Sequence, residues 1–348
     1  MEVMKAAVFT DVGKIEIKEI EKPVPQKGEV LVRIKACALC TWEQRIFKGV
    51  SRVPFPYIGG HEISGVIEEI GENVDEQRWK VGQKVAIRIL RSCGECHYCR
   101  TGANNLCEMI GKEGEELRLP YPGLGGLSEY LVVPPTKLFK LANDIPFEIG
   151  ALSEPLACVI HSVERANIEL GDDVVIIGAG VMGLLHVMIA KIRGARVIVS
   201  EINAERQKLA KQLGADEIIN PLEKDPVEEV KKLTEGRGAD VVINTTPVSK
   251  VAETTVQIAG KRGRVIFYSS QHPDYPIQIS PDWIHRSEIV ITGSVSPDIT
   301  DFYRATKLLS SKIVNPQLLI SEIVPFEKIE EAFRKATDPQ NYRIVVQL

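Results

Sequence analysis

The chain has 348 residues, a formal net charge of −4, 26% charged residues and 44% hydrophobic residues. This balance is typical of a globular protein, and the length suits two domains that each bury a core. Charges of both signs are interspersed and no apolar run is long enough to span a bilayer, so we expect neither nucleic acid nor a membrane as a partner. The start, MEVMKAAVF, carries no apolar signal segment, which favours a reduced, cytoplasmic compartment.

The first 150 residues have the pattern of a mainly-β domain. Alternating or β-branched runs predict strands, and breaks rich in glycine and proline separate them. The predicted strands are Lys5–Thr10, Gly28–Ala36, Ile63–Ile70 and Lys84–Ile89.

Four cysteines in this region follow the spacing C-x2-C-x2-C-x7-C. They are Cys93, Cys96, Cys99 and Cys107. Four thiolates that can turn onto one centre are the ligands of a closed tetrahedral zinc site, so we predict a structural zinc. The common iron–sulfur run is C-x2-C-x2-C-x3-C-P, whereas the last gap here is seven with no proline after it. Disulfides suit small secreted domains, and an odd total of seven cysteines argues against a pure disulfide framework.

From about residue 151, strands alternate with helices, which predicts βαβ units and a parallel sheet. The wholly apolar run Val174–Ile177 is typical of a strand buried on both faces. The further predicted strands are Arg196–Ser200, Glu217–Asn220, Asp240–Thr245, Arg264–Ser269 and Glu288–Thr292, and the predicted helices include Leu184–Ile192 and Ala204–Leu213.

The end of the chain departs from this alternation beyond Pro297. A helix through Leu308, another near Glu327–Ala336 and a closing strand Arg343–Leu348 are predicted, and we expect them to return to the first domain. The strand near Glu288–Val295 would be an unpaired edge in a monomer, which predicts a homodimer or homotetramer.

A glycine-rich motif G-x-G-x-x-G directly follows the predicted strand Val174–Ile177 and opens a helix. It runs from Gly178 through Ala179, Gly180, Val181 and Met182 to Gly183. In a dinucleotide-binding turn the first glycine permits the tight bend, the second removes a side chain where the pyrophosphate approaches, and the third lets helix and strand pack closely. The helix N-terminus then offers unpaired N–H groups to the phosphates. A glycine turn that serves packing alone is the alternative, and the strand–turn–helix context argues against it.

An acidic residue ends the next predicted strand. Glu201 stands near the spacing expected for the group that binds the adenosine ribose hydroxyls. Its carboxylate would repel a 2′-phosphate, which favours NAD over NADP, although Arg206 could accommodate that phosphate.

With both motifs in place, the chain resembles the zinc-dependent medium-chain alcohol dehydrogenases, and among them the sorbitol (polyol) and threonine dehydrogenase branch. The resemblance extends over essentially the whole length. It implies a GroES-like catalytic domain from residues 1–150 and 297–348 and a Rossmann NAD-binding domain, a doubly wound parallel sheet, from residues 151–296. The fold class is therefore α/β plus mainly-β.

The resemblance also implies a second, catalytic zinc, and thus two per chain. Its positions correspond to Cys40, His61 and Glu154, with Glu62 as a further or exchanging ligand and Glu43 as a carboxylate that orients a ligand. One thiolate, one imidazole and one carboxylate are zinc donors that leave a position for substrate. Taken singly, each residue has a structural alternative: a buried thiol, a turn cap or an acid at a helix start. Cys37, Cys158 and the other histidines are expected to be structural.

The activity that the resemblance implies is hydride transfer between NAD and a secondary alcohol or ketone, with zinc as the Lewis acid. By the same resemblance, the nicotinamide half of the cofactor would lie near two short segments. They are Tyr268, Ser269 and Ser270, and Ser294, Val295 and Ser296.

The chain departs from the family pattern beside the catalytic cysteine. Trp42 stands where the family has a serine or threonine that passes a proton outward, so the proton needs another route, through Thr41, a glutamate or water. Ile46 and Ser296 replace a tyrosine and an arginine of the polyol enzymes, which puts sorbitol itself in doubt. Arg45 could bind a carboxylate, and a sugar acid or hydroxy acid is our hypothesis for the substrate; a solvated arginine is the alternative.

Two other functions compete with a zinc-dependent polyol, sugar or sugar-acid dehydrogenase. Zinc-free quinone reductases share the fold but lack both sets of metal ligands. A catalytically silent nucleotide-binding structural or sensor protein would keep the fold and lose the chemistry. Trp42 favours the silent alternative, whereas Cys40, His61 and Glu154 argue against it.

Overall fold

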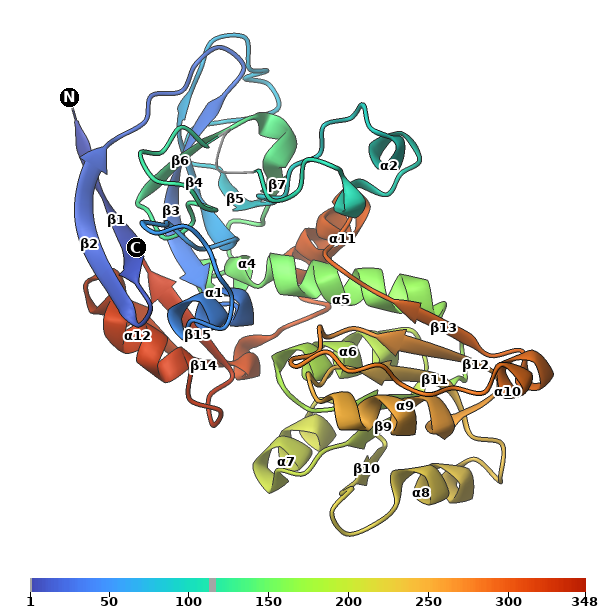
Figure 1. Ribbon diagram of the computed structural model, residues 1–348. Helices are drawn as coiled ribbons and strands as arrows, with labels where there is room; N and C mark the ends of the chain where they lie inside the picture. The colour runs from blue at the N-terminus through green and yellow to red at the C-terminus, as the bar shows by residue number, and fades with distance from the viewer. Residues whose placement is uncertain (1, 113–116) are drawn as a thin grey trace. The chain divides into compact units, whose positions relative to one another are not determined.

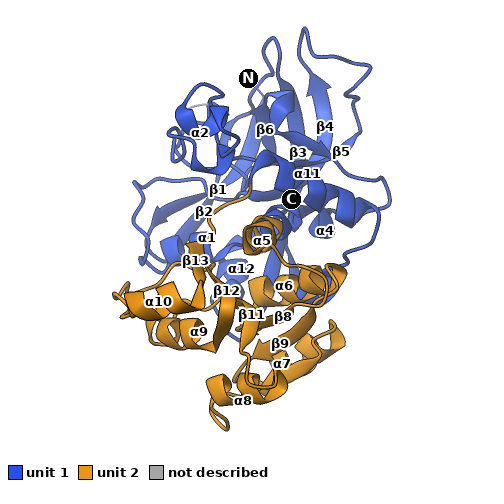
Figure 2. Cartoon of the chain, turned by 90° about the vertical axis from the view of Figure 1, so that its right-hand side faces the viewer, with its two compact units in different colours: residues 1–157, 298–348 blue, residues 158–297 orange. Residues whose placement is uncertain are grey.

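The computed structural model describes residues 2–112 and 117–348, which form two compact units (Figures 1 and 2). Unit 1 contains Met1–Ala157 and Asp298–Leu348, and unit 2 contains Cys158–Pro297. The first boundary falls within helix α5 (Ser153–Ala166), a few residues after the expected position.

Unit 2 is a doubly wound parallel sheet. Among the described residues six strands pair in the order β10-β9-β8-β11-β12-β13, all in parallel. The strands are β8 (Asp173–Ile177), β9 (Arg196–Ser200), β10 (Glu217–Ile219), β11 (Ala239–Asn244), β12 (Ala259–Phe267) and β13 (Val290–Gly293). The helices, besides the larger part of α5, are α6 (Val181–Ile192), α7 (Ala204–Gln212), α8 (Pro226–Leu233), α9 (Ala252–Ile258) and α10 (Pro281–Ser287). The order reverses between β8 and β11, and the carboxyl ends of strands at such a point are where these folds bind ligands.

The central strand of unit 2 follows from its sequence. All five residues of β8 are buried, as expected of an apolar strand with helices on both sides of the sheet. β13 lies at the edge of the sheet, so one of its sides has no strand neighbour among the described residues.

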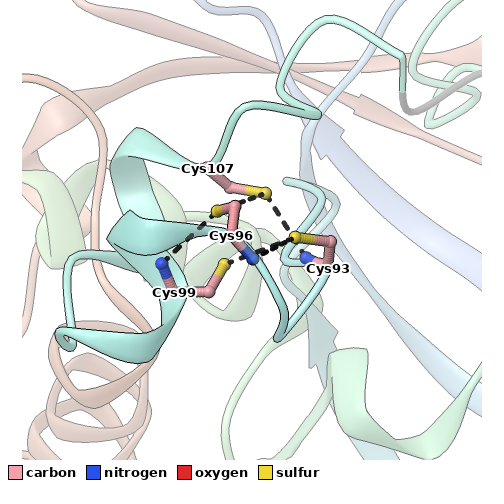
Figure 3. A group of neighbouring side chains, drawn as sticks. All are labelled: Cys93, Cys96, Cys99 and Cys107. Carbon is pink, nitrogen blue, oxygen red and sulfur yellow. Dashed lines mark hydrogen bonds between the residues drawn. The ribbon is translucent and has the colours of Figure 1, made fainter.

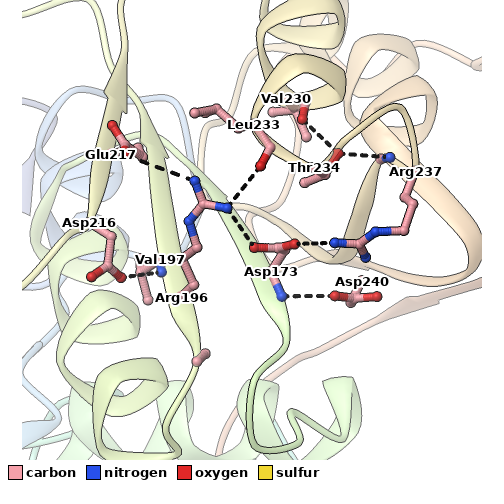
Figure 4. Close-up of polar contacts among 12 residues, drawn as sticks. Asp173, Arg196, Val197, Asp216, Glu217, Val230, Leu233, Thr234, Arg237 and Asp240 are labelled. Carbon is pink, nitrogen blue, oxygen red and sulfur yellow. Dashed lines mark hydrogen bonds and ion pairs between the residues drawn. The ribbon is translucent and has the colours of Figure 1, made fainter.

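A network of charged side chains joins the opposite, amino-terminal ends of these strands (Figure 4). Asp173, at the start of β8, pairs with Arg196 at 3.4 Å and with Arg237 at 3.2 Å. Its backbone N–H donates to Asp240 of β11. These contacts join three neighbouring strands, β8, β9 and β11, at their amino-terminal ends, opposite the glycine-rich turn.

Unit 1 is mainly β. Its strands are β1 (Val3–Asp11), β2 (Lys14–Glu21), β3 (Val30–Ala38), β4 (Glu62–Ile70), β5 (Lys84–Ile87), β6 (Tyr130–Val133), β7 (Leu138–Lys140), β14 (Ile320–Pro325) and β15 (Arg343–Gln347). Of the described strands, β1 and β2 form a hairpin and the others form one sheet, in which β3 pairs with β4, β6 and β15. The helices of unit 1, besides the start of α5, are α1 (Thr41–Phe47), α2 (His97–Arg100), α4 (Phe147–Ala151), α11 (Ile299–Ser310) and α12 (Ile329–Ala336).

Helix α1 is held in place by an aromatic cluster in the core of unit 1. Phe47, at the end of α1, stacks on Phe333 of α12 at 5.3 Å between ring centroids. Phe333 also meets Phe9 of β1 edge-on at 5.1 Å. Ile46 is fully buried beside them. This packing fixes one face of α1 and leaves the opposite face toward solvent.

No helix among the described residues is long and apolar enough to cross a membrane.

Candidate active site

Three side chains that could hold a metal ion gather where two antiparallel strands meet. The sulfur of Cys40, a ring nitrogen of His61 and a carboxylate oxygen of Glu62 all lie within 4.8 Å of one another. Ala38, the last residue of β3, pairs with Glu62, the first residue of β4, so the end of one strand faces the start of the other. The strand register therefore brings Cys40 next to His61 although the two are far apart in sequence.

The carboxylate of Glu43 orients the imidazole of His61. Glu43 is fully buried on the inner side of α1, and its Oε1 accepts from the backbone N–H of Gly60 at 3.0 Å and lies 2.7 Å from Nδ1 of His61. A histidine that donates its Nδ1–H in this way presents Nε2 as its ligand atom. Burial alone would lower the pKa of His61, but Glu43 and Cys40 raise it well above its usual value.

Glu62 has a partner that the sequence did not suggest. Arg343, at the start of β15, lies 2.9 Å from Oε1 of Glu62, and both side chains are almost fully buried. Arg343 also donates to the carbonyl oxygen of Leu39 at 3.0 Å, immediately before Cys40. Burial, reinforced by the charge of Glu154 and opposed by the attraction of Arg343, raises the pKa of Glu62 to about 7.

Glu154 lies near the cluster but outside the group of three. It is half-buried in the first turn of α5, and its carboxylate is close enough to act on the charges of Glu62 and Arg343. Three acidic side chains, Glu43, Glu62 and Glu154, thus accompany one thiol and one imidazole. Such a dense set of anionic groups fits a divalent cation, because burial without a compensating positive charge is costly.

The four cysteines converge as their spacing predicts (Figure 3). The Sγ–Sγ distances of Cys93–Cys99 and Cys96–Cys107 are both 4.0 Å, which is about twice a disulfide bond and close to the roughly 3.8 Å edge of a tetrahedral zinc–thiolate site. Backbone N–H groups point at the sulfurs, for example Cys96 N to Cys93 Sγ at 3.3 Å. Hydrogen bonds from the backbone lower the pKa of Cys96 to about 6. Burial instead raises the pKa of Cys99 to about 12, so it is the convergence of the four sulfurs, and not a uniform pKa shift, that fits a metal.

The glycine-rich turn of unit 2 is shaped by contacts that exclude side chains at two of its three glycines. Gly178 has φ +93°, in the left-handed region that favours glycine. A Cβ at Gly183 would lie 2.0 Å from the carbonyl oxygen of Gly178, so helix α6 and the turn are in direct backbone contact. At Gly180 the space is open, because the nearest atom to a Cβ is Nη1 of Arg206 at 3.9 Å.

Glu201 and Arg206 flank this turn. Glu201 follows β9 and is buried, and its two carboxylate oxygens accept from the backbone N–H groups of Ala179 at 2.7 Å and Asn203 at 2.8 Å. Glu201, which follows β9, is therefore hydrogen-bonded directly to the glycine-rich turn, while the guanidinium of Arg206 lies near Gly180. Val181 and Met182 form the first turn of α6.

The two segments expected near the nicotinamide follow β12 and β13. The strands are parallel, so Tyr268–Ser270 and Ser294–Ser296 leave the same edge of the sheet as Gly178. Ser269 Oγ donates to the carbonyl oxygen of Thr245 at 2.8 Å. Val295 is 58% exposed, and Ser296 has φ +53°.

Thr245 is a supporting residue that sequence analysis missed. Its hydroxyl donates to the carbonyl oxygen of Ile177 at 2.8 Å, and its Oγ1 would lie 3.0 Å from a Cβ at either Gly178 or Gly183. It thus joins β11 to the glycine-rich turn. A threonine after a strand has no distinctive pattern, so only the pairing of β8 with β11 reveals the role.

The family models agree with this architecture. A model described as zinc-binding dehydrogenase matches residues 181–311, and one described as alcohol dehydrogenase GroES-like domain matches residues 26–143. The chain is 32% identical over 347 residues to 2-dehydro-3-deoxy-L-galactonate 5-dehydrogenase of Pseudoalteromonas atlantica, covering 99% of this chain and 98% of that protein.

Two solved structures share the fold over the whole chain. A zinc-binding dehydrogenase of Sinorhizobium meliloti bound to NADP has a TM-score of 0.90 at 27% identity and covers 100% of both chains. An alcohol dehydrogenase of Escherichia coli CFT073 in complex with NADH has a TM-score of 0.88 at 26% identity, again with 100% of both chains covered.

The chain belongs to the zinc-dependent medium-chain alcohol dehydrogenase family. It is an oxidoreductase that acts on CH–OH groups with zinc and a nicotinamide cofactor. This confirms the resemblance and the predicted combination of a GroES-like domain with a Rossmann domain.

Proposed function

We propose that the protein transfers hydride between NAD and a secondary alcohol or ketone of a polyol, sugar or sugar acid. The observation that carries the proposal is the convergence of half-buried Cys40 and His61 with buried Glu62, together with the contact of Glu43 with His61. The name of the Pseudoalteromonas relative, a dehydrogenase of a sugar acid, supports the substrate class.

The ligands of the catalytic zinc in this proposal are Cys40, His61 and Glu154. Glu62 is already engaged with Arg343 at 2.9 Å, which favours Glu154 as the carboxylate donor and Glu62 as a ligand that exchanges. When bound, zinc supplies Lewis-acid polarisation of the reacting oxygen. By holding Nδ1 of His61, Glu43 would leave Nε2 as the ligand atom for a metal, and Arg343 would offset the charge of the surrounding acids.

The proton that leaves the alcohol needs a carrier other than Trp42, whose indole N–H cannot accept one. The hydroxyl of Thr41 lies 3.9 Å from Cys40 Sγ and is exposed, so it is the candidate nearest to the cluster along the chain. Thr41 therefore takes the first place in the proposed route, followed by water.

The cofactor in this proposal is NAD. The pyrophosphate would lie against Gly180 and the start of α6, and the adenosine ribose against Glu201. The nicotinamide would lie near Tyr268–Ser270 and Ser294–Ser296. The buried carboxylate of Glu201 disfavours a 2′-phosphate, whereas Arg206 favours one, so the ratio of kcat/KM for NAD and NADP tests this preference.

We also propose a second, structural zinc at the four cysteines, a cytoplasmic location and assembly into a homodimer or homotetramer. The assembly is supported by β13, an edge strand whose Val290 is 53% exposed. Sedimentation analysis of the wild type and of a Val290→Lys variant tests the edge strand, because a charge at this exposed position should shift the protein toward monomer.

The central experiment measures zinc per chain and NADH formation with simple alcohols, polyols, sugar acids and L-threonine. We expect two zincs and turnover in the wild type, and one zinc with activity lowered by about 1,000-fold or more in Cys40→Ser. Cys37→Ala is the matched control, because Cys37 is buried in neighbouring β3 and lies outside the metal-binding groups, so both zincs should remain. One zinc and no turnover in the wild type would favour the catalytically silent alternative.

A further inference from the structure

The outer side of α1 carries two residues that the zinc chemistry does not use. Trp42 and Arg45 are three positions apart, which places them about 60° apart around the helix. Glu43 and Ile46, by contrast, are buried against the core. Trp42 is 39% exposed, so part of its indole ring is open to a ligand.

Both residues follow a proposed zinc ligand closely along the chain, on a helix that the core of unit 1 holds in place. Cys40 is the residue that precedes the first turn of α1, so Trp42 lies within one turn of a proposed zinc ligand and Arg45 within two. Phe47 and Ile46 hold the inner side of the helix against Phe333. The outer side is therefore presented by a rigid element, as a binding residue requires.

The charges around the cluster explain why a cation matters at this place. Glu43, Glu62 and Glu154 are acidic and surround the metal ligands, and Arg343 is buried with them. A substrate carboxylate that approaches this site would be repelled by the acids unless a positive group outside the cluster met it. Arg45, half-buried on the outer side of α1, can supply that group, and a guanidinium can bind a carboxylate through two parallel hydrogen bonds.

We propose that Trp42 and Arg45 select a carboxylate-bearing sugar, an aldonate or a keto-deoxy sugar acid, over the uncharged polyol. The indole face packs against the C–H face of the carbon chain, and the guanidinium of Arg45 binds the carboxylate. This assignment rests on the proposed dehydrogenase function, which it narrows to one substrate class.

The test compares acids with matched polyols in the zinc-loaded protein. D-Gluconate and L-galactonate are set against sorbitol and galactitol, with L-threonine as a short hydroxy acid. We expect the better of the two sugar acids to exceed both polyols and L-threonine in kcat/KM by at least tenfold. Arg45→Met should raise the KM for that acid on the order of 30-fold and leave kcat and the polyols nearly unchanged. Arg45→Lys should recover part of the loss, since it keeps the charge but not the two-pronged geometry.

Arg52→Met is the control, because Arg52 is an exposed arginine shortly after α1 and its loss also removes one positive charge. We expect no change in KM for the acid. A direct readout is quenching of tryptophan fluorescence when gluconate or galactonate is added to the NADH complex, a signal that Trp42→Phe should remove.

Several outcomes would overturn the inference. A kcat/KM for the polyols that equals or exceeds that for the acids would exclude sugar acids as the preferred substrates. An equal rise in KM for acids and polyols in Arg45→Met would exclude a carboxylate contact of Arg45. If Arg52→Met raised the KM for the acid as much as Arg45→Met, the effect would come from the lost positive charge in general and not from binding by Arg45. No turnover of any alcohol would contradict the proposed function itself, and the inference would fall with it.

Discussion

The side-chain cluster of unit 1 and the glycine-rich turn of unit 2 are built in opposite ways. The cluster consists of ionisable side chains from separate segments of the chain, Cys40, His61 and Glu62, with Arg343 beside Glu62. The turn consists of backbone atoms from one short segment, and side chains such as Thr245 serve only to hold it. A charged site is therefore sensitive to the loss of a partner, whereas a backbone site is sensitive to the addition of atoms.

The largest expected effect comes from adding one methyl group to the turn. In Gly183→Ala the new Cβ would lie 2.0 Å from the carbonyl oxygen of Gly178, and backbone cannot rotate away as a side chain can. We expect NADH binding to weaken by more than 100-fold, with a lower melting temperature. Fluorescence titration with NADH and thermal unfolding measure the two effects.

Gly180→Ala is the matched control, because its Cβ has no atom closer than 3.9 Å. We expect normal melting but about tenfold weaker NADH binding, since a methyl group would stand where the pyrophosphate approaches. Unchanged NADH affinity in this variant would mean that the second glycine has no part in cofactor binding.

The next largest effect comes from removing a partner in the charged cluster. In Arg343→Met the carboxylate of Glu62 stays buried without its counter-ion, which costs about 3–5 kcal/mol of unfolding free energy. Urea unfolding of the zinc-loaded protein measures the loss. Adding Glu62→Gln should restore part of the stability, because the amide carries no charge to compensate, and a double variant less stable than Arg343→Met would show that the pair is not the cause.

The same contrast explains what the sequence could predict. The glycine-rich turn and the four cysteines are local, so spacing alone indicated both. Cys40 and His61 were proposed only through the resemblance to a family, because their contact depends on the register of β3 with β4. Arg343 escaped notice altogether, since it reaches Glu62 through the pairing of β15 with β3, and a single sequence does not specify which strands pair.

Short elements were missed for a related reason. Helix α1 has only seven residues, too few for a helical period to stand out, and its stability comes from packing on Phe333. The predicted strands of unit 2 were found more completely, because each is an apolar run between recognisable turns. The elements that sequence analysis missed are mostly those whose stability depends on tertiary contacts.

A smaller effect concerns a side chain that supports the backbone site. His186 of α6 is fully buried, its Nδ1 lies 2.7 Å from the carbonyl oxygen of Met182, and its ring meets Tyr268 edge-on at 4.8 Å. Burial lowers its pKa from 6.5 to about 4. The unfolded chain therefore binds a proton near pH 6.5 that the folded chain refuses until about pH 4, so stability is present above pH 6.5 and is lost as the pH falls toward 4.

We expect this one group to cost about 3 kcal/mol of unfolding free energy between pH 7 and pH 4. His186→Phe keeps a ring against Tyr268 and removes the titration, so its stability should fall less over the same range. Urea unfolding of both proteins at each pH isolates the difference. Parallel curves for the two proteins would show that His186 does not stay neutral.

The smallest effect tests whether the charged network at the amino-terminal ends of the parallel strands is independent of the glycine-rich turn at their carboxyl ends. Asp173 is buried, whereas the side chains of its partners Arg196 and Arg237 are 39% and 59% exposed and can return to water when the carboxylate is neutralised. We therefore expect Asp173→Asn to cost only about 1–2 kcal/mol of unfolding free energy. Glu205→Gln, which breaks an exposed pair with Lys208, should cost less than about 0.5 kcal/mol.

NADH affinity should stay constant in both variants, because Asp173 starts the strand whose other end carries the glycine-rich turn. Weaker NADH binding in Asp173→Asn would mean that the charged network around Asp173 also shapes the glycine-rich turn.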